Sequence, residues 1–295
     1  MREEIRKIQS LMESAEYVTD APVATSVHLA LSLKKPLLIE GHAGVGKTEV
    51  AKVMARMLET NLIRLQCYEG LDASAALYEW NYQKQLLHIK LDEGAHKPVS
   101  QEEQEIFSES FLLKRPLLQA ISQEQSPVLL VDEVDRADEE FEAFMLEVFS
   151  DWQVTIPEIG TIKATHPPHV ILTSNRTREL SDALRRRCLY LWIDYPPFDK
   201  EIAIVQRKVP GIDARLAREV ARFMESLRKV RLAKVPGVAE TLDWATALSG
   251  LHADHLDETL VNETLGCVLK DADDMKRFRA EVGKSGLAPF LQQTG

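Results

Sequence analysis

The sequence predicts an α/β protein in which a doubly wound parallel sheet of five strands is followed by an all-helical C-terminal domain. Five short apolar runs alternate with helical patterns, a glycine-rich loop directly follows the first run, and the strand pattern ends at Pro196-Pro197. Continuous apolar runs are typical of parallel strands that are buried on both faces. Strands that alternate with helices form βαβ units and therefore a doubly wound sheet.

Residues 1–33 are predicted to be helical, because LALSL gives an apolar face and Asp20-Ala21-Pro22 forms a turn at a helix start. Helical patterns also follow the glycine loop (TEVAKVMARMLE) and the acidic end of the third strand (EEFEAFMLEVFSD). The five predicted strands are PLLIE (36–40), LIRLQC (62–67), PVLLVDE (127–133), HVILTSN (169–175) and LYLWIDY (189–195).

Beyond Pro197 only helical spacing remains, as in DARLAREVARFMESLRK and DETLVNETLGCVLK. We therefore predict an α/β domain over residues 1–197 and a helical domain over residues 198–295. Within the first domain, residues 152–165 predict a hairpin, because WQVTI and TIKA flank a turn that ends in glycine.

The segment of residues 70–110 is the least regular part of the chain. Tyr78, Trp80 and Tyr82 occupy alternate positions there, which we interpret as a hairpin strand that packs one aromatic face. The alternative is that these rings stack on a ligand.

Composition narrows the functional class. The chain has 295 residues, 45% of them hydrophobic, with a net charge of −10 that argues against a protein that coats nucleic acid. It has no run of about 18 apolar residues and no apolar stretch behind the charged N-terminus, so we expect neither a membrane span nor a secretory signal. Three widely separated cysteines predict reduced thiols in a cytoplasmic protein.

Residues 41–48, GHAGVGKT, match the phosphate-loop pattern G-x-x-x-x-G-K-[ST]. Glycines let backbone N–H groups turn toward phosphate oxygens, and the next helix directs its positive end at the same anion. Lys47 is expected to contact the β- and γ-phosphates, and the Thr48 hydroxyl to ligate Mg²⁺. The residues predicted to bind the nucleotide are Gly41, Ala43, Gly44, Val45, Gly46, Lys47, Thr48, Glu49 and Asp132.

Acidic and amide side chains end two later strands. Asp132 stands at the tip of the third predicted strand and is expected to hold the magnesium through water, with Thr48 as the other predicted metal-binding residue. Glu133 is the candidate base that polarises the attacking water. Asn175, at the end of the fourth strand, is expected to orient that water; a helix or turn cap is its alternative role.

Three consecutive arginines, Arg185, Arg186 and Arg187, precede the fifth strand. A solvated helix end would explain them, because basic residues stabilise helix C-termini. The sharper hypothesis is an arginine finger that completes the nucleotide site of a neighbouring subunit. Such a finger acts in trans and requires a ring or a filament.

The order GHAGVGKT, LLVDEVD, LTSN, ALRRRC and then a helical lid resembles the AAA+ ATPases, and within them the MoxR group. The resemblance implies ATP rather than GTP, Mg²⁺, a hexameric ring, a partner with a von Willebrand factor A domain, and a client protein. It also implies an insertion in the second helix and a pre-sensor hairpin at the residues noted above. Arg187 aligns with the family's finger position, and Arg186 is the second choice.

More narrowly, RLQCYEGLD, LYEWNYQKQLL, TRELSDALRRRC and VPGVAETLDWATAL resemble the CoxD-type subgroup, named after an accessory ATPase of carbon monoxide dehydrogenase maturation. One feature departs from the family. Many relatives carry a lid arginine that touches the γ-phosphate, whereas Thr241 stands near that place here, with Arg231 and Lys234 as possible substitutes.

These observations predict a magnesium-dependent ATP hydrolase that remodels or matures a client protein. One alternative is a motor stimulated by nucleic acid, against which the acidic balance and the lack of a DNA-binding motif count. The other is a slow scaffold that recruits a partner when ATP is bound.

Overall fold

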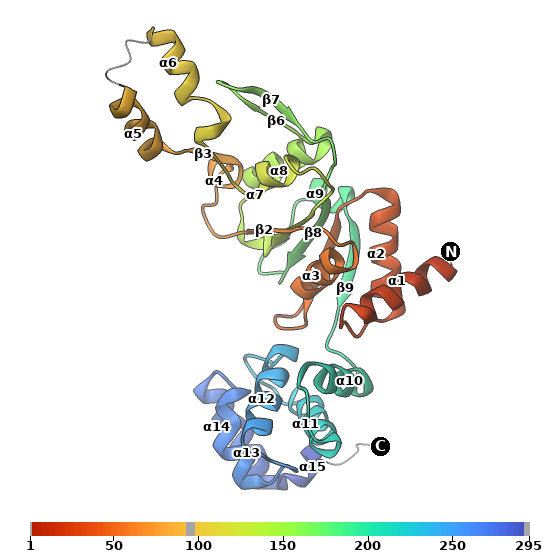
Figure 1. Ribbon diagram of the computed structural model, residues 1–295. Helices are drawn as coiled ribbons and strands as arrows, with labels where there is room; N and C mark the ends of the chain where they lie inside the picture. Colours follow the sequence, from red (N-terminus) through yellow and green to blue (C-terminus); the bar gives the residue numbers. More distant parts are fainter. Residues whose placement is uncertain (1, 93–97, 292–295) are drawn as a thin grey trace. The chain divides into compact units, whose positions relative to one another are not determined.

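The computed structural model describes residues 2–92 and 98–291, which divide into two compact units (Figure 1). The first unit holds most of the sheet and the elements that surround it, and the second holds the C-terminal helices. The first comprises residues 2–11, 21–40, 48–92 and 98–191. The second comprises residues 12–20, 41–47 and 192–291.

A five-stranded sheet is the centre of the α/β part, in the order β2-β5-β8-β1-β9. Its strands are β1 (Leu37–Gly41), β2 (Leu62–Gln66), β5 (Val128–Asp132), β8 (His169–Ser174) and β9 (Leu189–Ile193). The β2–β5, β5–β8 and β8–β1 pairs are all parallel. All five strands predicted from apolar runs are therefore confirmed, and so is the doubly wound α/β fold.

The apolar runs form strands because both of their faces are covered. Every residue of β1 and of β5 is buried, and in β8 only His169 is not. β2 is one of the two edge strands, and Arg64 in its middle is exposed. At the carboxyl ends of the strands the apolar residues give way to Gly41, Asp132 and Ser174. This edge is where parallel sheets bind ligands.

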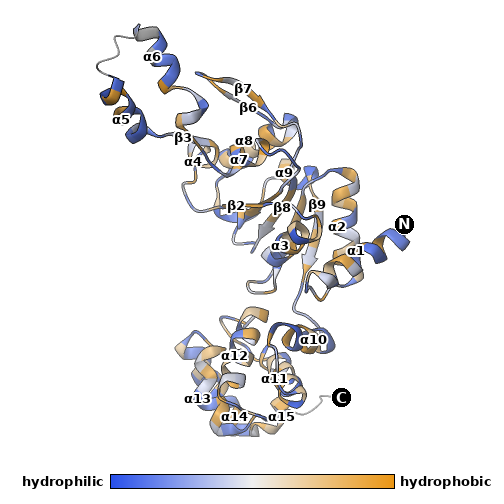
Figure 2. Ribbon diagram, in the orientation of Figure 1, coloured by the Kyte–Doolittle hydropathy of each residue, from blue (hydrophilic) through white to orange (hydrophobic). Residues whose placement is uncertain are grey.

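Helices from the N-terminus to β9 alternate with these strands. Those outside the segment of residues 70–110 are α1 (Arg2–Ser14), α2 (Ala21–Leu33), α3 (Lys47–Met57), α7 (Pro116–Ile121), α8 (Glu139–Asp151) and α9 (Asp182–Arg187), with the 3₁₀ turn η2 (Val134–Arg136). Asp138 caps α8 by accepting a hydrogen bond from Phe141 N, at 2.8 Å. Apolar residues predominate in α2, whereas α1 is largely hydrophilic (Figure 2).

The segment of residues 70–110 is more regular than the sequence predicts. It contains α4 (Ala73–Leu77), β3 (Tyr78–Trp80), α5 (Tyr82–Asp92), α6 (Val99–Ile106) and η1 (Glu109–Phe111), and β3 pairs antiparallel with β4 (Leu112–Lys114). The aromatic strand is confirmed for Tyr78 and Trp80. It is wrong for Tyr82, which begins a helix and is 62% exposed, because Asn81 Oδ1 accepts a hydrogen bond from Lys84 N and turns the chain. Residues 93–97 of this segment lie outside the described residues.

The predicted hairpin is confirmed as β6 (Gln153–Ile156) paired antiparallel with β7 (Gly160–Lys163). Gly160 adopts a φ of 100°, a left-handed conformation that glycine takes without strain.

The C-terminal helices bury their own core. They are α10 (Phe198–Lys208), α11 (Ala214–Leu227), α12 (Val238–Gly250), α13 (Glu258–Thr264), η3 (Leu265–Cys267), α14 (Ala272–Ser285) and α15 (Ala288–Leu291). Phe223 packs against Trp244 and Phe278 at the centre of this core, and Trp244 Nε1 donates to Thr264 Oγ1 at 2.7 Å. Within residues 2–92 and 98–291, no helix combines the length and the apolar character needed to cross a bilayer.

Candidate functional site

The phosphate loop, Gly41–Thr48, leaves the end of β1 and enters α3. Gly44 and Gly46 have φ values of 74° and 94°, so glycine is required at both. Gly41 is required for another reason, because a Cβ there would lie 2.1 Å from Ile193 O. Lys47 is buried, and its Nζ donates to Gly41 O at 2.9 Å and to His42 O at 2.7 Å. The lysine is thus held against the loop that the sequence assigned to phosphate.

Two predicted metal-binding residues meet at the sheet edge. Thr48 Oγ1 lies 3.0 Å from Asp132 Oδ1, and Asp132 is only 3% exposed. Thr173 on β8 donates a second hydrogen bond to the same oxygen, at 2.5 Å. A hydroxyl and a buried carboxylate are the hard oxygen ligands that Mg²⁺ prefers, so these residues fit that ion.

Arg64 is a partner of Asp132 that the sequence analysis missed. Its Nε and Nη2 lie 3.0 and 2.6 Å from Asp132 Oδ2. The same guanidinium donates to Gln66 Oε1, and both arginine and glutamine are on β2. The alternation RLQ in an otherwise apolar edge strand was the available signal, because it places two polar side chains on one face.

Glu133 occupies a strained position directly after β5. Its φ and ψ are 55° and 49°, a left-handed conformation that costs a non-glycine residue on the order of 1–2 kcal/mol. Its backbone N–H donates to Thr173 Oγ1 at 2.9 Å, which helps hold this conformation. Gln66 Nε2 and Asn175 Nδ2 lie 3.2 and 3.5 Å from its two carboxylate oxygens. The structure therefore brings together the predicted base and the predicted water-orienting amide.

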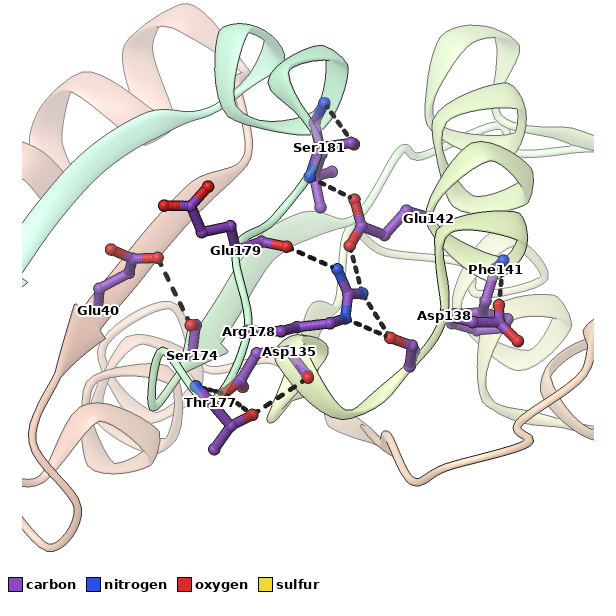
Figure 3. A network of polar contacts seen from close by, with 12 residues as sticks. Glu40, Asp135, Asp138, Phe141, Glu142, Ser174, Thr177, Arg178, Glu179 and Ser181 are labelled. Atoms are coloured by element: carbon purple, nitrogen blue, oxygen red, sulfur yellow. Dashed lines mark hydrogen bonds and ion pairs between the residues drawn. The ribbon is translucent and has the colours of Figure 1, made fainter.

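The loop after β8 is fixed by Asp135, a buried residue for which the sequence analysis gave no role. Asp135 Oδ1 accepts from Asn175 N at 3.2 Å. Its Oδ2 accepts from Thr177 N and Thr177 Oγ1 at 2.8 and 2.7 Å (Figure 3). Three hydrogen bonds to one carboxylate fix the backbone that carries Asn175. Asp135 is thus a positioning residue for the site.

A second buried carboxylate holds the next part of this loop. Glu142 on α8 is fully buried, forms an ion pair with Arg178, and accepts from Ser181 N at 2.9 Å (Figure 3). Arg178 Nε also donates to Ala137 O at 2.8 Å. Because each polar atom of the pair has hydrogen-bond partners, burial of the two charges is compensated.

Carboxylates dominate the electrostatic environment at this end of β5. Burial, together with the smaller effect of the nearby charges of Asp132, Asp135 and Glu133, raises the pKa of the Cys67 thiol to about 12. The thiol therefore stays protonated and cannot serve as a nucleophile at neutral pH. A site with this much negative charge requires cations when an anionic nucleotide enters.

The three arginines of the predicted finger have different surroundings on α9. Arg185 Nη2 lies 3.9 Å from Glu40 Oε2, a buried carboxylate just before the phosphate loop. Arg187 is half-buried, and its Nη2 donates to Phe149 O at 3.1 Å. Arg186 is exposed, and its side chain forms no hydrogen bond or ion pair with any of the described residues.

Near the lid position at which many relatives carry an arginine, this chain has a buried ion pair. Thr241 is fully buried, and its Oγ1 lies 2.7 Å from Glu201 Oε1. Arg228 forms two hydrogen bonds of 2.7 Å with the same carboxylate. Thr241 is therefore part of the helical core, whereas Arg231 and Lys234, the substitutes named from sequence, are exposed.

Within the second unit, the start of α12 contacts the phosphate loop through its backbone. Val238 N and Ala239 N donate to Gly44 O at 2.9 and 3.2 Å. A Cβ on Gly237 would lie 2.7 Å from Ala43 O, so only glycine permits this approach.

A phosphate loop after β1, with acidic residues at the end of the parallel strand β5, defines the class of P-loop ATPase-type domains. Residues 36–188, more than half of the chain, match the family described as AAA domain (dynein-related subfamily). The chain belongs to this AAA family. ATP binding, usually with Mg²⁺, is implied by that membership.

The chain is also similar to uncharacterized bacterial proteins and to solved structures. An uncharacterized protein of Staphylococcus epidermidis is 24% identical over 217 residues, which cover 71% of this chain and 74% of that protein. One from Staphylococcus aureus (strain bovine RF122) is 25% identical over the same length and coverage. Two point mutants of Thermotoga maritima RuvB superpose with TM-scores of 0.54 and 0.52, at 18% and 17% identity, over 92% and 91% of this chain and 77% and 76% of theirs. At this identity the likeness shows the fold alone.

Proposed function

We propose that this chain is a magnesium-dependent ATP hydrolase that assembles into a ring and remodels a client protein. One arrangement carries the proposal. Thr48 is hydrogen-bonded to Asp132, and Glu133, the next residue, lies 3.5 Å from Asn175, which directly follows the neighbouring strand β8. A protein that only sensed nucleotide would need the first pair and not the second.

Each side chain has a defined task in this scheme. The loop N–H groups and Lys47 hold the phosphates. Thr48 and Asp132 would hold Mg²⁺, which supplies charge neutralisation on the phosphate oxygens. Glu133 accepts a proton from the water whose oxygen attacks the γ-phosphorus, while Asn175 orients that water and ADP leaves. The left-handed backbone of Glu133 supports this role, because strained residues concentrate at functional sites.

The ring follows from the arginines on α9. Arg185 is directed toward Glu40 of its own chain, which leaves Arg186 and Arg187 as candidates for the finger. Arg187 has the position expected from the family resemblance, but its guanidinium donates to its own chain. Exposure and the absence of a described partner favour Arg186. Either side chain would neutralise charge that develops on a neighbour's γ-phosphate.

The finer assignment to the MoxR group, and to its CoxD-type subgroup, rests on the order of motifs in the sequence. It adds a hexamer, a von Willebrand factor A domain partner, a client protein and a cytoplasmic location. In this scheme residues 1–197 form the ATPase domain and residues 198–295 the lid. The β6–β7 hairpin and the segment of residues 70–110 would contact the client and rearrange with the nucleotide state.

Steady-state ATP hydrolysis against chain concentration tests the proposal, with Mg²⁺ present, no partner, and light scattering recorded in parallel. Activity per chain should rise as oligomers form. If activity per chain stays constant while oligomers form, the three arginines would be explained as a solvated helix end and not as a finger. A rate that increases only when DNA is added would favour a nucleic-acid motor instead.

Mixing experiments assign the finger. Arg186→Ala and Arg187→Ala chains are each assayed alone, and a variant that is inactive alone is titrated with chains that carry Lys47→Ala. A finger variant retains an intact phosphate loop, so mixed rings should regain activity at interfaces where a Lys47→Ala chain donates the arginine. If Arg187→Ala is rescued and Arg186→Ala is active alone, Arg187 is the finger.

A further inference from the structure

We infer that Arg64 is a displaceable counter-cation of Asp132, and that it must leave this carboxylate before Asp132 can help hold Mg²⁺. This role for Arg64 rests on the proposed function, in which Asp132 is a magnesium-binding residue. It adds a built-in competition to that function: in the resting chain, one positive side chain occupies the acidic group that the metal requires.

The contacts of Asp132 divide between its two oxygens. Oδ1 accepts from Thr48 and Thr173, at 3.0 and 2.5 Å. Oδ2 accepts only from Arg64 among the contacts that the described residues make, through Nε at 3.0 Å and Nη2 at 2.6 Å. Two N–H groups of the guanidinium thus occupy this oxygen. The guanidinium is therefore a competitor for this oxygen.

Strand register explains why an arginine reaches this position. In the parallel β2–β5 pair, Arg64 is opposite Leu130 and Gln66 is opposite Asp132. The long side chain of Arg64 extends two residues toward the carboxyl end of the sheet, parallel to its own strand. Ile63 and Leu65 point to the other face and are buried, so the backbone of β2 stays anchored when the arginine moves.

The two partners differ in their freedom to move. The Asp132 side chain is 5% exposed, whereas that of Arg64 is 53% exposed. Arg64 can therefore swing into water without breaking the core, and Asp132 cannot follow it. A divalent cation and a guanidinium on the same carboxylate repel each other, and the arginine is the one that can leave.

The alternative is an ordinary ion pair that satisfies a buried carboxylate and plays no part in metal binding. The two cases differ in one quantity, the gain in nucleotide affinity that Mg²⁺ confers. A structural pair would alter affinity equally with and without metal. A competitor lowers this gain, because its displacement costs free energy only when the metal binds.

Binding of a fluorescent ATP analogue is therefore measured with Mg²⁺ and with EDTA, in Glu133→Gln chains that do not hydrolyse it. The variants are Arg64→Gln, Arg64→Lys and the control Arg115→Gln, which removes an exposed arginine paired with Glu79 outside the site. The ratio of the dissociation constants in EDTA and in Mg²⁺ should increase at least about fivefold in Arg64→Gln. The ratio for Arg64→Lys should lie between those of Arg64→Gln and the parent, and the ratio for Arg115→Gln should equal that of the parent.

Thermal unfolding provides the second readout. Arg64→Gln should lose stability in EDTA, because Asp132 loses its counter-cation, and Mg²⁺ with ADP should restore more of it than in the parent. An unchanged or smaller affinity ratio in Arg64→Gln, while the parent binds nucleotide in a magnesium-dependent way, overturns the displacement and leaves the ATPase proposal intact. If the parent binds no nucleotide, the proposed function itself fails.

Discussion

The Thr48 hydroxyl lies 3.0 Å from a carboxylate oxygen of Asp132, although 84 positions separate the two residues in the chain. Thr48 lies in the first turn of α3, and Asp132 is the last residue of β5. Parallel strands bring them together, because the loop after β1 and the tip of β5 meet at the same edge of the sheet. The predictions that follow concern this edge and the elements that hold it.

Glu133→Gln should keep ATP bound and lower the hydrolysis rate by about 10²–10⁴-fold, because the amide cannot accept the proton of the attacking water. Glu147→Gln is the control, since it makes the same change at an exposed position of α8. Equilibrium nucleotide binding and phosphate release are measured for both. Ordinary turnover in Glu133→Gln would exclude Glu133 as the base.

Arg178→Ala should lower the free energy of unfolding by about 3–5 kcal/mol, because the fully buried Glu142 would lose its counter-ion. Arg115→Ala breaks an ion pair whose side chains are 46% and 51% exposed, and should cost about 0–1 kcal/mol. Urea denaturation compares them. Equal losses would mean that Arg178 contributes no more than a surface pair.

Gly237→Ala should weaken ATP binding several-fold. The Gly237 φ of −91° is open to alanine, so the backbone itself is not strained. The added Cβ would instead lie 2.7–2.8 Å from backbone atoms of Ala43 and Gly44 and push the phosphate loop away from α12. Gly250→Ala, in the same helix with no heavy atom within 4 Å of its Cβ, is the control. Matching affinities in the two variants would show that the contact does not affect the loop.

The Cys188 thiol should react with alkylating reagents far more slowly in the native protein than in urea. Burial raises its pKa, and the value is about 12 even with the opposing effect of the nearby charge of Arg187. The thiolate fraction at pH 8 is then on the order of 10⁻⁴, and it should keep rising tenfold per pH unit beyond pH 9. Mass spectrometry of the alkylated peptide follows the rate from pH 7 to 10. A plateau near pH 9 would indicate an ordinary thiol.

The residues of the phosphate loop and the acidic end of β5 were accessible from sequence because their signals are local. A glycine loop must follow a strand directly, and a fully apolar run that ends in Asp132 and Glu133 identifies both a buried strand and its functional tip. The five strands and the hairpin follow from the same short-range patterns. The chemical roles of the phosphate-loop residues, Asp132 and Glu133 in hydrolysis stay predictions.

Tyr82 shows where a local pattern fails. Alternating aromatic residues favour a strand through Tyr78, Trp80 and Tyr82, and the chain follows this pattern only for the first two. Asn81 then caps a helix, and a single side-chain hydrogen bond outweighs the alternation.

By itself the sequence determined which residues are candidates for phosphate, metal and proton chemistry, and the parallel sheet that brings them to one edge. Only the tertiary structure decided their partners: Arg64 and Gln66 from the edge strand, Asp135 beneath Asn175, and the burial of Thr241 against Glu201. These partnerships depend on the register between strands and on the packing of helices that are far apart in the chain. Local patterns encode which face of an element is buried, whereas register and packing decide which polar groups meet there.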